Sequence, residues 1–279
     1  MQSVPNSWLD VFTKGCLFLT HIYPILIVVV IGYLFINRKL FGEVIVIIAF
    51  TLVFNRFLKS IFQAPLPPAL GKSGWAFPSG HMQLAFAMWG WIAWRYRYKW
   101  FWIVLGIFLT GVGVGLVYQG YHYPRDIPAA VLFAGLSLVG FNYFFRSQWV
   151  KQHVGYSFII LIGIGLILMS FIPNGWKMPT PYLGLGVLTG AYLGWWMRLG
   201  AKISSLEEVS RNMRQRIFDL IGVALGVVLL FWAGFLIKGS VDEVVFQFFF
   251  GLLLTAWLTG GGLLLGYFLQ AKCFRKSCI

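Results

Sequence analysis

The sequence at residues 75–81 is Trp-Ala-Phe-Pro-Ser-Gly-His, and an apolar run from Met82 to Trp94 follows it directly. Proline and glycine favour a turn, so this polar break places His81 at the start of a helix that enters a membrane. A second break, Gly-Tyr-His-Tyr-Pro-Arg-Asp at residues 120–126, interrupts a later apolar segment. It places His122 and, four positions on, Asp126 at another boundary between helix and membrane surface.

The composition around these motifs is that of an integral membrane protein. Hydrophobic residues make up 59% of the 279 residues and charged residues only 11%, a balance that excludes a soluble domain. The formal net charge is +14, but the basic residues lie singly or in small groups between apolar runs. They indicate membrane topology, and no nucleic-acid partner is predicted.

Apolar stretches of spanning length predict an all-α polytopic helix bundle of about nine spans. These stretches are 16–36, 41–62, 79–98, 100–120, 127–146, 155–173, 180–198, 216–237 and 245–269. The predicted organisation is a five-span core in residues 1–150 and a four-span extension in residues 151–279.

The loops between these stretches alternate in charge, and lysine and arginine gather on one side. By the positive-inside rule the N-terminus lies outside, the C-terminus is cytoplasmic and both histidine motifs face outward. No Asn-x-Ser/Thr acceptor is present, which favours a bacterial inner membrane.

Several polar residues are expected to meet at that outer face. The second predicted span delivers Lys59 there, and a proline- and glycine-rich loop, residues 63–74, follows it as a candidate roof. A histidine can attack phosphorus when a carboxylate holds its other ring nitrogen, and His122 and Asp126 have a suitable spacing. His81 is placed to protonate a leaving oxygen.

The start of the third predicted span offers anion-binding groups. Backbone amides beside Ser79 and Gly80 are expected to bind phosphate oxygens, and Lys59 adds positive charge. Two isolated histidines, His21 and His153, are interpreted as structural.

The extension carries glycines at four-residue spacing, which permits close helix packing in lipid. They are Gly186, Gly190 and Gly194 on one predicted helix and Gly262 and Gly266 on another. Packing within the chain is the favoured interpretation and a homodimer contact the alternative. The oligomeric state is not predicted.

Residues 50–140 resemble the type-2 phosphatidic acid phosphatases, a family of membrane lipid phosphatases. The family's middle motif is matched in full by residues 78–81, and His122 and Asp126 occupy the closing positions of its third motif. The resemblance implies that His122 forms a phosphohistidine, Asp126 orients it, His81 protonates the leaving group and Lys59 contacts phosphate. It implies no metal and no cofactor.

Two arginines of the family pattern are absent. Leu66 and Leu116 stand where the first and third motifs carry phosphate-binding arginines. Arg56, Lys72 and Arg125 are candidates to supply the missing positive charge.

The predicted function is hydrolysis of a lipid phosphomonoester or diphosphate at the extracytoplasmic face, with a lipid phosphate as substrate. One alternative is a phosphotransferase similar to the sphingolipid synthases, which also lack the usual arginines. The other is a lipid-binding or lipid-moving protein without turnover.

Overall fold

The structure is a computed structural model that describes residues 8–71, 73–172, 179–200, 213–237 and 239–276. Within these ranges the chain is helical and forms no sheet, which confirms the predicted all-α class. The helices are α1 (Trp8–Phe18), α2 (Ile22–Ile31), α3 (Arg38–Phe62), α4 (Gly80–Tyr96), α5 (Lys99–Tyr118), α6 (Asp126–Arg146), α7 (Gln148–Gln152), α8 (Val154–Ser170), α9 (Pro179–Gly200), α10 (Met213–Ile237), α11 (Glu243–Ala256) and α12 (Gly262–Lys276). Short π-helical turns, Gly32–Ile36 and Trp257–Gly261, follow α2 and α11.

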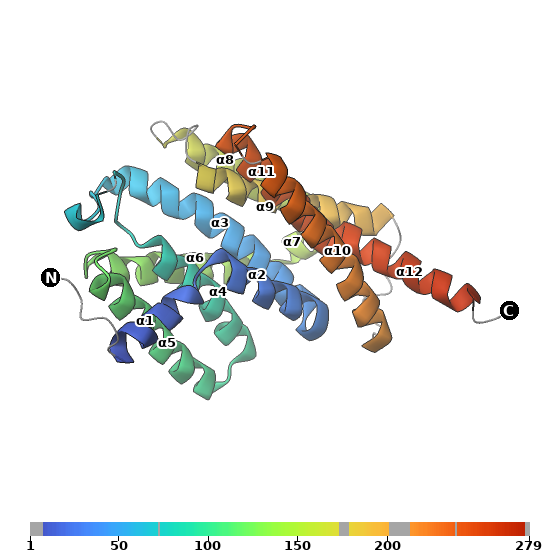
Figure 1. The fold of residues 1–279 in the computed structure, drawn as a ribbon, viewed down its shortest axis with the longest axis horizontal. Coiled ribbons are helices and arrows are strands. Elements are labelled where there is room, and N and C mark those ends of the chain that lie inside the picture. Colours follow the sequence, from blue (N-terminus) through green and yellow to red (C-terminus); the bar gives the residue numbers. More distant parts are fainter. Residues whose placement is uncertain (1–7, 72, 173–178, 201–212, 238, 277–279) are drawn as a thin grey trace.

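Helix α3 runs through the middle of the molecule (Figure 1). On one side it packs against α4, which in turn contacts α5 and α6, while α1 lies along α5. On the other side α9 lies against α3 and carries α8 and α11. Helices α10 and α12 pair with each other toward the C-terminal end. Helices α3, α4, α5 and α6 therefore belong to one packed group.

Five of the described helical segments are long and apolar enough to cross a bilayer, and a sixth is counted if α1 and α2 form one bent span. The chain is thus an integral membrane protein, although the predicted number of nine spans is not confirmed. Two predicted spans are short, since α4 and α8 have 17 residues each.

The first predicted span, 16–36, is broken. Helices α1 and α2 meet at an angle of 57°. Pro24 lies in the first turn of α2, where its missing N–H costs nothing, whereas a continuous helix would need that N–H. The break places His21 directly before α2.

The glycines of the extension make close helix contacts within the chain. A Cβ on Gly186 of α9 would lie 2.1 Å from the carbonyl oxygen of Phe248 on α11. A Cβ on Gly266 of α12 would lie 2.9 Å from the amide nitrogen of Asp219 on α10. Only glycine allows the backbones to approach this closely.

Candidate active site

The turn after α5 fixes the position of His122. Gly120 adopts a left-handed conformation with φ of 71°, which a residue with a side chain rarely takes. The amide of Gly120 donates to the Val117 carbonyl at 3.0 Å and that of Tyr121 to the Leu116 carbonyl at 2.9 Å, the pattern of a Schellman helix end. The His122 amide also donates to Leu116, at 3.2 Å, so His122 is held against the end of α5.

His122 and Asp126 form the predicted pair. Nδ1 of His122 lies 3.1 Å from Oδ2 of Asp126. The amide of Tyr123 donates to the same oxygen at 3.0 Å, and the Asp126 amide donates back to the Tyr123 carbonyl at 2.9 Å. Asp126 is fully buried at the first position of α6, where the helix dipole favours a carboxylate.

This environment keeps His122 in its neutral form. Burial lowers the pKa of the His122 imidazole, because desolvation disfavours the charged ring. The hydrogen bond to Asp126 raises that pKa in part, and the positive charge of Lys59 lowers it again. The net direction is downward, which leaves an unprotonated ring nitrogen for nucleophilic attack.

Ser79 joins the two histidine motifs. It caps α4, since its side chain accepts from the Met82 amide, and its own amide donates to the Asp126 carbonyl at 3.2 Å. The Ser79 amide is therefore engaged within the protein. The amides of Gly80 and His81 occupy the first turn of α4, where a helix offers no backbone acceptor, and they remain the phosphate-binding candidates.

Lys59 lies beside the histidines. Its ammonium donates to the Trp75 carbonyl at 2.8 Å, which ties the end of α3 to the loop before α4. The loop folds back on itself, with the Ala76 amide donating to the Ala64 carbonyl at 2.7 Å. Lys59 interacts electrostatically with His81 and His122. The structure therefore brings the predicted cation, acid and nucleophile to one place.

Asn55 was not predicted as a site residue, and it supports the turn that leads into α4. Its amide nitrogen donates to the Pro78 carbonyl at 3.2 Å and to Oε1 of Gln83 at 2.7 Å. Asn55 and Gln83 are both buried. A Cβ on Gly80 would lie 3.1 Å from Oδ1 of Asn55, which explains the glycine there. The sequence signal for Asn55 is its polar side chain, which lies one turn before Lys59 on the same face of α3.

His21 was also left out of the predicted site. Its ring centroid lies 5.8 Å from that of His81. The two rings come from elements that are 60 positions apart, the break between α1 and α2 and the start of α4. No local pattern in the sequence reports such a contact.

Helix α1 packs beside the third motif. A Cβ on Gly115 would lie 3.1 Å from Cβ of Thr13 and 3.2 Å from Leu17, so Gly115 lets α1 lie close to α5. Leu116, at the position of a family arginine, is 1% exposed in the apolar cluster of α1, α4, α5 and α6. The side chain at position 116 is therefore a packing residue.

The other candidate cations lie as follows. Arg56 donates to the Thr180 hydroxyl of α9 at 3.1 Å. Arg125 is exposed, with its guanidinium 5.4 Å from the Tyr123 ring centre and 4.0 Å from Oδ1 of Asp126. Lys72 lies outside the described residues.

Comparison with known proteins finds similarity to one protein superfamily and to one curated protein. The model of the PAP2 superfamily matches residues 40–150. A probable sphingosine-1-phosphate phosphatase of Dictyostelium discoideum is 24% identical over 219 residues, which cover 70% of this chain and 54% of that protein. The chain thus spans about half the length of the curated relative it matches. No solved structure is a significant match.

The matched segment contains Lys59, His81, His122 and Asp126, the same residues on which the sequence resemblance rests. The similarity to the PAP2 superfamily thus covers the part of the chain that carries the candidate site.

Proposed function

We propose that this protein is a membrane lipid phosphatase that hydrolyses a lipid phosphomonoester or diphosphate through a phosphohistidine on His122. The observation that carries the proposal is the contact between Nδ1 of His122 and the buried carboxylate of Asp126. Because Nδ1 is held, Nε2 is the ring nitrogen available to attack phosphorus. The name of the Dictyostelium relative supports a lipid phosphomonoester as the substrate class.

The reaction has two steps. Nε2 of His122 attacks phosphorus, the bond from phosphorus to the lipid oxygen breaks, and His81 gives its proton to that leaving oxygen. His81 then takes a proton from water, whose oxygen attacks phosphorus while the bond between phosphorus and Nε2 of His122 breaks, so that inorganic phosphate leaves and His122 is regenerated. Asp126 stabilises the positive charge that His122 carries while it is phosphorylated.

His21 is our candidate for a donor that replaces part of the role of the missing arginines. Its ring lies beside that of His81, and it follows α1, the helix that packs against Gly115 where the third motif departs from the family pattern. Together with Lys59 and the first-turn amides of α4, it would donate to phosphate oxygens in the transition state.

The distribution of basic residues between loops supports an extracytoplasmic site, with the N-terminus outside and the C-terminus in the cytoplasm. Assignment to a bacterial inner membrane stays a prediction.

The test is release of inorganic phosphate from sphingosine-1-phosphate, phosphatidic acid and a polyprenyl diphosphate by purified protein in detergent micelles. Wild type should release phosphate from at least one of them, and His122→Ala should release none. His153→Ala is the matched control, since His153 bonds to the Trp149 carbonyl at the other end of the bundle. Its activity should equal that of wild type.

The lipid products of the same reactions test the phosphotransferase alternative, which the leucines at positions 66 and 116 favour. A new phospholipid formed without free phosphate would replace hydrolysis by transfer. Absence of both products from all substrates, with an acceptor lipid present, would contradict the proposal.

A further inference from the structure

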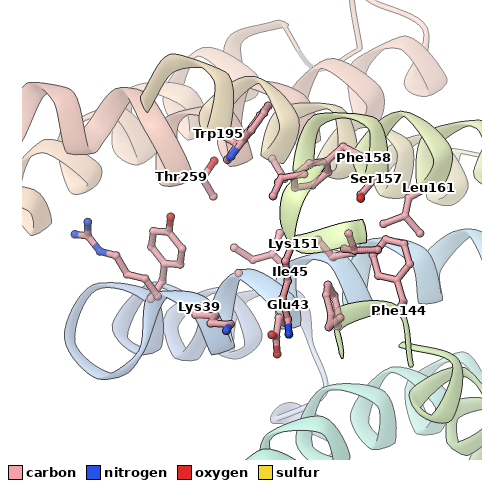
Figure 2. Close-up of a pocket in the computed structure, with 18 of the residues that line it drawn as sticks. Lys39, Glu43, Ile45, Phe144, Lys151, Ser157, Phe158, Leu161, Trp195 and Thr259 are labelled. Atoms are coloured by element: carbon pink, nitrogen blue, oxygen red, sulfur yellow. The ribbon is translucent and has the colours of Figure 1, made fainter. Parts of the chain in front are cut away.

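A cavity of about 320 Å³ lies between the first half of α3, α8 and α9 (Figure 2). Glu43 in its wall and Lys59 at the candidate active site are 16 positions apart on α3, about 24 Å along a helix axis. None of the proposed catalytic residues lines it. The cavity is therefore separate from the phosphatase site.

The inner wall of the cavity is mostly apolar, and Ser157 and Thr259 are among its polar members. Figure 2 shows Ile45 of α3 on one side and Phe158 and Leu161 of α8, with Trp195 of α9, on the other. Such a lining suits a hydrocarbon chain better than a polar group.

The acidic residue of the wall is already neutralised. The Glu43 carboxylate accepts from Nε1 of Trp91 at 3.1 Å and from Nε of Arg95 at 2.9 Å, and it forms an ion pair with Arg95. Glu43 therefore leaves no negative charge to offset cations at the mouth.

Two lysines at the mouth carry positive charge without an acidic partner. Lys39 of α3 and Lys151 of α7 both line the cavity and are exposed, and neither forms an ion pair with a described residue. The neighbouring Arg38 differs, because it pairs with Asp219 of α10 at 2.8 Å. The lysines belong to separate elements, so the fold brings two exposed cations to one cavity, which Arg198 of α9 also lines.

We propose that this cavity binds one anionic phospholipid, with a hydrocarbon chain against the apolar wall and the phosphate between Lys39 and Lys151. A volume of about 320 Å³ lies at the lower end of the range for ligand pockets, roughly 300–1,000 Å³, so it admits a chain and leaves the headgroup at the rim. Lysines near a membrane surface attract anionic lipids. The ligand is thus defined by a chain and a phosphate together.

An ordinary basic flank would behave differently. Basic residues beside membrane helices attract anionic lipids through the surface potential alone, whatever their position at that end of the bundle. The proposed site instead needs the two lysines that line the cavity, and it needs the apolar space behind them.

The experiment is a titration of the purified full-length protein, followed by native mass spectrometry, with phosphatidylglycerol or phosphatidylcholine of identical chains. Wild type should bind phosphatidylglycerol roughly 10- to 30-fold more tightly, as expected for attraction by two lysines. The double variant Lys39→Gln/Lys151→Gln should lose this preference. Lys99→Gln/Arg146→Gln removes two exposed cations outside the cavity and should keep it.

Two further arms test the placement of the chain. Ala191 lines the cavity, so Ala191→Leu fills part of it and should weaken phosphatidylglycerol binding about ten-fold. Thermal unfolding shows whether the variant is folded. Glycerol phosphate, which has no chain, should not compete. Full competition, an unchanged Ala191→Leu affinity, or equal loss of preference in both double variants would overturn the proposal.

Discussion

Nδ1 of His122 lies 3.1 Å from Oδ2 of Asp126, and the Tyr123 amide donates to that same oxygen at 3.0 Å. One carboxylate oxygen thus orients the imidazole and closes the turn that carries it. Because Asp126 opens α6 and its carbonyl accepts from the Ser79 amide, the orientation of His122 depends on α4 as well.

Replacing Asp126 by asparagine should lower kcat about 10³- to 10⁴-fold, as expected when an orienting carboxylate is replaced and the imidazole takes the wrong tautomer. Phosphate release from the best substrate in the panel is the measurement. The shape of the side chain is retained, so the protein should still fold.

Asp242→Asn is the control for this change. Asp242 caps α11 through the amides of Val244 and Val245, and asparagine caps helices equally well. Its kcat should match that of wild type. An Asp126→Asn variant with wild-type kcat would show that the pair has no role in turnover.

The pH profile should report the burial of His122. Attack requires the neutral ring, and activity falls as pH drops through its pKa. Because burial lowers the pKa of His122, the acid limb of kcat/KM should lie below about 6.5, the ordinary value for histidine. The measurement is kcat/KM between pH 4 and 8, and an acid limb above 6.5 would contradict the prediction.

The hydrogen bond from His122 to Asp126 allows a second prediction about the position of the acid limb. Its hydrogen bond raises the pKa of His122, so the residual activity of Asp126→Asn should show an acid limb at still lower pH. A limb that moves upward in the variant would mean that a different group controls it.

The local features of the site were predictable from sequence. The turn before His81 and the four-residue spacing of His122 and Asp126 depend on proline, glycine and helix geometry, which act over a few residues. Lys59 followed from helix length alone, because α3 must end at the face where α4 begins.

The contact of His21 with His81 was not predictable in this way. It requires α1 to pack against Gly115 of α5, and the helix to break before Pro24. A hydropathy window reads residues 16–36 as one apolar span, and it carries no information about which helix lies against which. The cavity between α3, α8 and α9 depends on tertiary packing for the same reason.

His21→Ala should reduce kcat/KM about 10²-fold if His21 donates to the phosphate in the transition state. His21→Gln keeps an N–H donor and should recover part of the loss. Steady-state kinetics on the best substrate provide the measurement.

A change at Phe18 controls for packing around His21, since its ring centroid lies 6.5 Å from that of His21. Phe18→Leu should leave kcat/KM unchanged. If His21→Ala also keeps the wild-type value, His21 has no part in phosphate binding.

Asn55→Leu should destabilise the fold by about 1–3 kcal/mol, because Oε1 of buried Gln83 loses its donor. Thermal unfolding in detergent gives the comparison. Asn142→Leu is the matched control, since Oδ1 of buried Asn142 has no hydrogen-bond partner among the described residues. That change should be neutral or stabilising, and the reverse order of the two melting temperatures would refute the assigned network.

The proposed mechanism requires a covalent phosphoryl group on His122. The direct measurement is rapid denaturation at alkaline pH during turnover of a lipid phosphate labelled with ³²P, followed by location of the label in peptides. We expect an acid-labile, base-stable label on the peptide that contains His122, absent from His122→Ala and retained in His153→Ala. Phosphate release by wild type with no label at His122, under conditions that trap a known phosphohistidine enzyme, would contradict it.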